Sequence, residues 1–166
     1  MRRQRGFTLL EVLIVLAITS LIIAPLTLAT TTLMTGPQRT TDQSIVLQQV
    51  QNTGYWLSRD VQMARSVNST DPNGFPLTIN IPVDTDENND YTIDYLFNGN
   101  TLKRQVYDSS HILVSETFIA NYIDTNNTTF SEVEPAVYQL TVRAVIDETS
   151  ETITYEIKQR LSLSPG

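Results

Sequence analysis

One stretch near the start of the chain decides its organisation, and it reads Gly6-Phe7-Thr8-Leu9-Leu10-Glu11-Val12-Leu13-Ile14-Val15-Leu16-Ala17-Ile18. Apolar and small residues continue to Met34, and the only charged residue between Arg5 and Arg39 is Glu11. An ionisable side chain inside a segment of membrane length is energetically costly and indicates a function. The role of this carboxylate is therefore the main question that the sequence raises.

The apolar run is long enough to span a bilayer. From Phe7 to Met34 it would form a helix of about 42 Å, whereas the hydrocarbon core of a membrane is about 30 Å thick. Three arginines, Arg2, Arg3 and Arg5, precede the run. Because positive charges stay on the cytoplasmic side, we expect a cytoplasmic N-terminus and a body outside the membrane.

Several kinds of segment share these features. A secretory signal peptide has an apolar region of only about 7 to 15 residues and ends in an A-x-A-like site, which this run lacks. The length and apolarity of the run disfavour a buried helix of a soluble protein. An inert, uncleaved signal anchor remains an alternative.

The local order of residues resembles the cleavage and methylation signature of type IV prepilins and type II secretion pseudopilins. The shared features are a short basic leader, Gly6, Phe7, and Glu11 as the fifth residue after the cut. The resemblance implies that a prepilin peptidase cuts between Gly6 and Phe7 and that Phe7 is N-methylated. It also implies partners: other pilin or pseudopilin subunits, an inner-membrane assembly platform, and the lipid bilayer before assembly.

Cleavage would create a cationic amino group on Phe7, about one helical turn from Glu11. In a filament of packed apolar stems, the amino group of a neighbouring subunit could neutralise the Glu11 carboxylate and fix the axial register between subunits. The alternative is that Glu11 reaches the nearby interface and has no such role.

Composition limits the possible functions. The chain has 166 residues, a net charge of -7 and no cysteine, so no disulfide or thiol chemistry is available. Because three of the basic residues lie in the leader, the body is more acidic than the whole chain, and we expect no nucleic-acid partner. The absence of cysteine also departs from many major pilins, which by the resemblance favours a minor pilin or a pseudopilin.

Two interruptions and a change of pattern follow the apolar run. Pro25 should kink the helix, and Gly36-Pro37 predicts a bend before the body. An amphipathic helix is then predicted over 41–67. Its expected buried stripe consists of Val46, Val50, Thr53, Leu57, Val61, Ala64 and Val67. Its expected polar face includes Gln48, Gln49, Gln51, Ser58, Asp60 and Gln62. Trp56 is expected to anchor the core, and Gly54 to allow close approach of a strand.

The rest of the chain is rich in β-branched and aromatic residues. Turn residues at 71–74 should end the helix, and strands are predicted over 77–83, 91–97, 101–107, 112–123 (as two short strands), 137–147 and 152–163. Asn98-Gly99-Asn100 and 148–151 are predicted hairpin turns, and 124–135 a loop. The fold class is therefore α+β, with a long N-terminal helix, half membrane segment and half amphipathic, packed on an antiparallel sheet.

Two body segments carry a narrower resemblance. Leu57-Ser58-Arg59-Asp60-Val61-Gln62-Met63-Ala64 is similar to a stretch of J-type minor pseudopilins and W-type minor pilins. The pair Tyr91-Thr92-Ile93-Asp94-Tyr95 and Leu102-Lys103-Arg104 is similar to a strand pair of the same proteins. The resemblance implies a minor subunit.

Chemistry is scarce in the sequence. Asp84, Asp86, Asn88 and Asp90 are spaced like the start of a calcium loop, but Asn89 and Tyr95 replace the glycine and glutamate that such a loop needs, so a solvated acidic loop is favoured. The single histidine, His111, lies beside Ser109 and Ser110 without a nucleophile motif. We therefore expect no enzyme activity, metal site or cofactor.

The sequence thus predicts three parts: a cytoplasmic leader at 1–6, a transmembrane and filament-stem helix at 7–36, and an extracytoplasmic pilin-like domain at 37–166. The expected protein is a structural subunit, and a minor one, of a type IV pilus or a type II secretion pseudopilus, first anchored in the inner membrane by a single span. The alternative function is a membrane-anchored binding module, such as an adhesin or a DNA-uptake tip protein.

Overall fold

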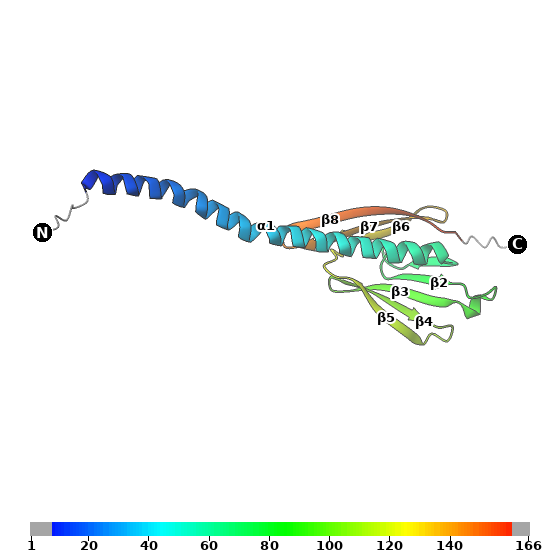
Figure 1. Cartoon of the computed structure of the whole chain (residues 1–166). Helices are drawn as coiled ribbons and strands as arrows, with labels where there is room; N and C mark the ends of the chain where they lie inside the picture. Colours follow the sequence, from blue (N-terminus) through cyan, green and yellow to red (C-terminus); the bar gives the residue numbers. More distant parts are fainter. Residues whose placement is uncertain (1–7, 161–166) are drawn as a thin grey trace. The chain divides into compact units, whose positions relative to one another are not determined.

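The computed structural model describes the backbone of residues 8–160 and, within this range, all side chains except those at 24 and 31–39. The chain divides into two compact units, Met1–Thr41 and Asp42–Gly166. The first unit contains the N-terminal part of helix α1, and the second contains the remainder of α1 and all eight strands (Figure 1).

Helix α1 runs from Leu9 to Met63. It continues through Pro25 and through Gly36-Pro37, so the helix does not end at either position. The kink at Pro25 and the bend at Gly36-Pro37 stay predictions. A proline removes only one backbone donor, and the hydrogen bonds on either side can continue the helix. In the first unit, hydroxyl groups also bond to the preceding turn: Thr19 donates to the Val15 carbonyl at 2.6 Å and Thr30 to that of Leu26 at 2.7 Å.

The helix ends four residues before its predicted end. Val67, which we expected on the helix, lies in strand β1 (Ser66–Ser69) and pairs with Ile79. Low helix propensity at Ser66, Val67 and Asn68 lets the strand pairing prevail. The Gln159 side chain donates to the carbonyls of Ala64 (2.7 Å) and Arg65 (3.1 Å), just beyond the end of the helix.

The buried stripe of the helix is otherwise confirmed. Its fully buried members are Val46, Val50, Thr53, Leu57, Val61 and Ala64. Gly54 is also buried, against the ring of Tyr155, which leaves no space for a Cβ atom and confirms the predicted close approach of a strand. The Tyr155 hydroxyl donates to the Val50 carbonyl at 3.3 Å.

Five strands form an antiparallel sheet in chain order. They are β1, β2 (Leu77–Ile81), β3 (Tyr91–Asn98), β4 (Thr101–Tyr107) and β5 (Leu113–Ala120). The hairpin between β3 and β4 is confirmed, with Asn98 opposite Thr101 and Gly99 at φ +59° as the first turn residue. Two short strands expected over 112–123 are instead one strand, β5, while Ile123 forms an isolated bridge to Ala144.

The remaining strands form a second antiparallel sheet, whereas one sheet was expected. They are β6 (Thr129–Glu134), β7 (Val137–Ile146) and β8 (Thr149–Lys158). Strand β6 lies within 124–135, a segment that we predicted to be a loop. The strand was not predicted because only one of its residues, Phe130, is buried, so its sequence shows little alternation of apolar and polar residues. The β7–β8 turn is Asp147-Glu148 rather than 148–151, since Ile146 pairs with Thr149.

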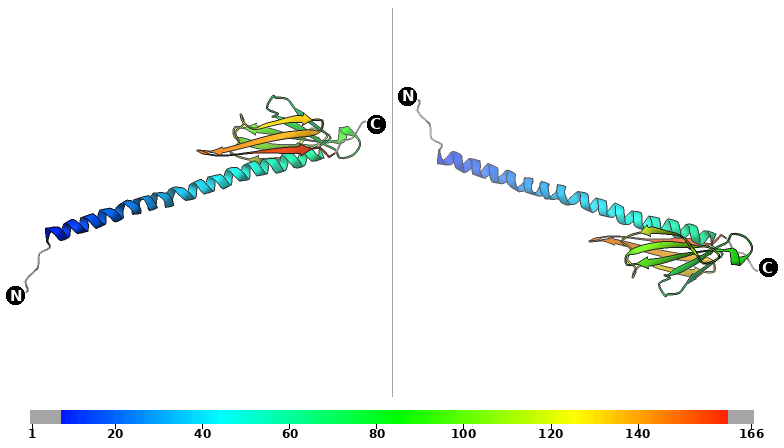
Figure 2. Two further views of the ribbon diagram at one scale, coloured as in Figure 1. Left: turned by 90° about the horizontal axis from the view of Figure 1, so that it is seen from above. Right: turned by 90° about the horizontal axis from the view of Figure 1, so that it is seen from below.

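Both sheets cover one face of α1 within the second unit (Figure 2). One core joins them: helix residues such as Leu57 and Val61 are buried together with Leu77, Ile79 and Tyr95 of the first sheet and with Leu140, Val142 and Ile157 of the second. The α+β class, with a long helix packed against antiparallel sheets, is therefore confirmed.

Candidate functional site

Thr8 caps the N-terminus of α1. Its carbonyl oxygen accepts hydrogen bonds from the N–H groups of Glu11 (3.0 Å) and Val12 (3.3 Å), and its hydroxyl oxygen accepts a further bond from the Glu11 N–H at 3.3 Å. The first N–H groups of a helix lack intrahelical partners, and such a cap satisfies them. Glu11 lies in the first turn, where a negative charge is favoured by the helix dipole.

The Glu11 carboxylate and the apolar residues around it are exposed. In the described part of the chain, no cation forms an ion pair with Glu11. Leu9 is 83% exposed, and the segment Leu9–Thr30, with 22 residues and a mean hydropathy of 2.6, is long and apolar enough to cross a membrane. This unit thus presents one carboxylate on an otherwise apolar helix surface.

The predicted cleavage and methylation residues, Gly6 and Phe7, lie outside the described residues, as does the basic leader. The structure adds Thr8, which the sequence argument had missed. Its signal was present, because Thr8-Leu9-Leu10-Glu11 has the spacing of a capping box, in which Ser or Thr precedes Glu by three residues.

A buried ion pair forms the polar centre of the second unit. The Asp60 carboxylate is 1% exposed and accepts hydrogen bonds through Oδ2 from Arg104 Nε and from the Tyr95 hydroxyl, both at 2.7 Å. The expectation that Asp60 lies on the polar face of the helix is therefore wrong. Position 60 follows Leu57 by three residues and Thr53 by seven, so it falls on the buried face.

Burial and the neighbouring charge shift two pKa values in this cluster. Burial raises the pKa of the Tyr95 hydroxyl well above its ordinary value, and the Asp60 carboxylate raises it further. Burial opposes the charge of Arg104, but the hydrogen bond and charge of Asp60 outweigh it and raise the pKa of the guanidinium. The Tyr95 hydroxyl therefore stays protonated and Arg104 stays charged at neutral pH, and their hydrogen bonds to Asp60 join α1 to β3 and β4.

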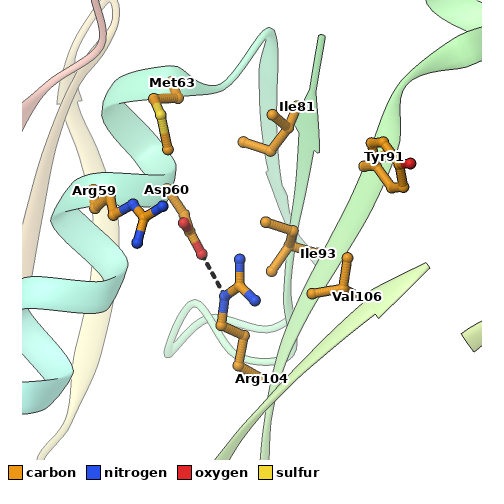
Figure 3. A pocket seen from close by; sticks show the side chains of 8 residues that line it. All are labelled: Arg59, Asp60, Met63, Ile81, Tyr91, Ile93, Arg104 and Val106. Atoms are coloured by element: carbon orange, nitrogen blue, oxygen red, sulfur yellow. Dashed lines mark hydrogen bonds and ion pairs between the residues drawn. The ribbon is translucent and has the colours of Figure 1, made fainter. Parts of the chain in front are cut away.

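A pocket of about 310 Å³ lies beside this cluster, between α1 and the first sheet (Figure 3). Its lining is mainly apolar, with the guanidinium groups of Arg59 and Arg104 on one side; the lining residues are Arg59, Asp60, Met63, Ile81, Tyr91, Ile93, Arg104 and Val106. Both guanidinium groups also lie over the ring of Trp56, at 5.6 and 5.2 Å from its centre. Trp56 packs against the core, as expected, and additionally contacts these cations.

The acidic loop 84–90 is held by hydrogen bonds among its own residues and to Arg65. The Asp86 carboxylate accepts from the Asn88 backbone N–H at 3.0 Å, while Arg65 Nε donates to Asp90 Oδ2 at 2.7 Å and its terminal nitrogen to Asp90 Oδ1 at 3.1 Å. Asp90 is thereby occupied by a guanidinium. Among residues 8–160, no group of three or more His, Cys, Asp or Glu side chains could hold a metal ion.

His111 lies in a turn held by Asp108. The Asp108 carboxylate accepts hydrogen bonds from the N–H groups of Ser110 (3.0 Å) and Ile112 (2.9 Å), and the His111 ring stacks on Tyr107. The residues around the single histidine therefore build a turn.

Comparison with known proteins adds one finding. Residues 1–27 match the family model described as the prokaryotic N-terminal methylation motif. No curated protein and no solved structure matches the chain. The chain thus carries an N-terminal methylation motif of the prepilin type, and the motif lies on an apolar N-terminal helix long enough to anchor it in a membrane. Pilin-like proteins, which carry this motif, are generally not enzymes.

Proposed function

We propose that this chain is a structural subunit, and a minor one, of a type IV pilus or a type II secretion pseudopilus. The observation that carries the proposal is the methylation motif at residues 1–27 on a helix whose apolar surface is exposed around a single carboxylate. An apolar helix of this kind needs either lipid or other helices around it. The membrane provides lipid before assembly, and the filament core provides other helices afterwards.

The proposed mechanism is processing followed by assembly. Prepilin peptidase removes the leader 1–6 by cutting between Gly6 and Phe7, and Phe7 is methylated. The stem at 7–36 then leaves the bilayer for the filament core, while the extracytoplasmic domain at 37–166 forms the outer surface. The Glu11 carboxylate, unpaired within the described residues, receives the Phe7 amino group of a neighbouring subunit and fixes the axial register.

The buried cluster supports the assignment to the J-type or W-type minor subunits. The two segments that resemble these proteins are distant in sequence, yet Asp60 from one lies 2.7 Å from Tyr95 and Arg104 of the other. The contact between Asp60 and the pair Tyr95 and Arg104 therefore explains why these residues occur together in the two segments.

The mass of the mature N-terminus tests the proposal. In cells that contain a type IV pilus or type II secretion system, the chain should lose residues 1–6 and gain one methyl group. The variant Gly6→Leu should remain uncut in the membrane, while the matched control Gly99→Asn, in an exposed turn at φ +59°, should be processed normally. An intact Met1, or a cut after residue 24, would contradict the proposal.

A further inference from the structure

Pockets of similar size in the second unit differ in the charges that line them. The pocket of about 310 Å³ beside Asp60 has two guanidinium groups in its lining, those of Arg59 and Arg104. Two other pockets, of about 340 and 320 Å³, have Asp124 and Asp71 respectively in their linings and no cationic side chain. Although the chain has a net charge of -7, the pocket beside Asp60 is therefore cationic, and we call it the arginine pocket.

The carboxylate of Asp60 balances only one of the two guanidinium groups. Asp60 Oδ2 accepts the hydrogen bonds of Arg104 Nε and of the Tyr95 hydroxyl, both at 2.7 Å. No carboxylate of the described residues forms an ion pair with Arg59, whose guanidinium instead lies over the Trp56 ring, 5.6 Å from its centre. The lining of the arginine pocket thus has one positive charge without a counter-ion.

Arg104 also presents hydrogen-bond donors to the arginine pocket. Its ion pair with Asp60 uses Nε, and a guanidinium has further N–H groups on its two terminal nitrogens. Figure 3 shows these nitrogens directed away from the Asp60 carboxylate, toward Ile93 and Val106. The guanidinium is held by the Asp60 carboxylate and by the Trp56 ring, whose centre is 5.2 Å away. Donors that are fixed in advance lose less entropy when they bind an anion.

The rest of the lining is mainly apolar. It consists of side chains from α1, β2, β3 and β4: Met63, Ile81, Tyr91, Ile93 and Val106. An inorganic anion would pair with the arginines but leave these side chains uncovered, and a neutral apolar molecule would leave Arg59 without a counter-ion. A carboxylate on an apolar body matches both parts of the lining. The body must be short, because a cavity of about 310 Å³ is at the lower end of the range of ligand sites.

We propose that the arginine pocket binds a small carboxylic acid with an apolar body, in its ionised form. The carboxylate accepts hydrogen bonds from the guanidinium groups of Arg59 and Arg104, and the body covers the apolar part of the lining. All of the lining residues belong to the second unit, which has its own core. The proposal therefore goes beyond the proposed function and does not depend on filament assembly.

A methionine in the lining provides a direct measurement. The full chain in nonionic detergent micelles, with carbon-13 in its methionine methyl groups, is titrated with 3-phenylpropanoate, a water-soluble acid of the proposed class. The Met63 resonance should shift to saturation, with a dissociation constant in the millimolar range expected for so small a ligand. Met34, in the apolar run of the first unit, controls for partition of the acid into the micelle and should show no saturable shift. If the Met63 resonance does not shift to saturation, the proposal is wrong.

Two further compounds separate the charge of the ligand from its apolar body. The alcohol 3-phenylpropan-1-ol has the same body without the charge, and acetate has the charge without the body. Each should bind at least tenfold more weakly than 3-phenylpropanoate in the same titration. Equal binding of the alcohol would mean that the arginines do not contribute, and equal binding of acetate would mean that the pocket takes any small anion. Either result would overturn the proposal.

A variant of the unpaired arginine provides the second measurement. Arg59→Gln should weaken the binding of 3-phenylpropanoate about tenfold, because the carboxylate loses a charged hydrogen-bond donor. The matched control is Lys158→Gln, which removes the same charge from an exposed position on β8, outside the pocket, and should leave binding unchanged. Urea unfolding followed by Trp56 fluorescence shows that each variant is folded. Equal losses in the two variants would mean that binding follows the net charge of the unit, which contradicts the proposal.

Discussion

Two carboxylates on the same helix have opposite surroundings. Asp60 is 1% exposed and receives a guanidinium and a hydroxyl group from within its own unit. Glu11 is exposed on an apolar surface, and its carboxylate pairs with no cation among residues 8–160. The second unit thus satisfies its buried charge internally, whereas the Glu11 carboxylate has no such partner among the described residues.

The apolar residues of the helix show the same contrast. From Val46 to Val61, the apolar stripe is covered by two sheets of the same chain. Along Leu9–Thr30, the apolar side chains are exposed on all sides. A helix that is apolar all round requires lipid or a protein core around it. The second unit therefore contains its own core, and the first becomes part of a core only in a membrane or an assembly.

Replacing Glu11 should have the largest effect on function. For Glu11→Val we expect normal membrane insertion and processing but at least a tenfold loss of incorporation into filaments, because the register contact to the Phe7 amino group is missing. Immunolabelled filaments and the mature N-terminal mass measure the two outcomes separately.

The control for Glu11 is Thr8→Ala, which removes the helix cap but keeps the carboxylate. Loss of a cap destabilises a helix by about 1 kcal/mol, and incorporation should remain close to that of the wild type. If Thr8→Ala and Glu11→Val were equally defective, Glu11 would act through the helix terminus and the contrast with Asp60 would disappear.

Removing Arg104 should have the largest effect on stability. Arg104→Met leaves the Asp60 carboxylate buried without its cation, which we expect to lower the free energy of unfolding by about 3 to 5 kcal/mol. Urea unfolding of the full chain in detergent, followed by the fluorescence of Trp56, measures this loss. The double variant Asp60→Leu with Arg104→Met should recover much of it; no recovery would mean that Arg104 stabilises the unit mainly by its packing on Trp56.

A smaller effect is expected for Tyr95→Phe. The variant loses one hydrogen bond to a charged acceptor, worth about 1.5 to 3 kcal/mol at neutral pH. The wild type has a raised Tyr95 pKa, so above pH ~10 the unfolded chain releases this proton while the folded chain keeps it, and stability falls as the pH rises.

Tyr95→Phe should therefore show a shallower fall of stability above pH ~10 than the wild type. Tyr138 and Tyr155, whose pKa values burial also raises, retain part of the slope. Urea unfolding at neutral and alkaline pH makes the comparison, with Tyr122→Phe, at an exposed position, as the control. Identical slopes in Tyr95→Phe and wild type would refute the assignment.

Local patterns predicted much of this structure. The spacing of Val46, Val50, Leu57 and Val61 located the buried face of the helix, and Gly99 located a hairpin turn. These features depend on short stretches of sequence. Roles that depend on another molecule, those of Gly6, Phe7 and Glu11, stay predictions.

Features set by distant contacts were predicted less well. The sequence near Asp60 predicts a polar surface residue. Its burial depends on hydrogen bonds from Tyr95 and Arg104, which are distant in the sequence. Only one side chain of strand β6 is buried, so side-chain burial contributes little to this strand. Its hydrogen bonds to β7 hold it in place. The helix end at Met63 is likewise decided by the pairing of β1 with β2.

The contacts between the helix and the last strand have a consequence for the time course of folding. Tyr155 bonds to Val50 across 105 residues, and Gln159 bonds to Ala64 across 95. Contacts between residues so far apart in sequence form slowly, and during synthesis the N-terminal residues emerge first. The helix from Asp42 to Met63 thus exists as a chain segment well before β8 can cover it. The core of this unit therefore stays incomplete until β8 has been synthesised.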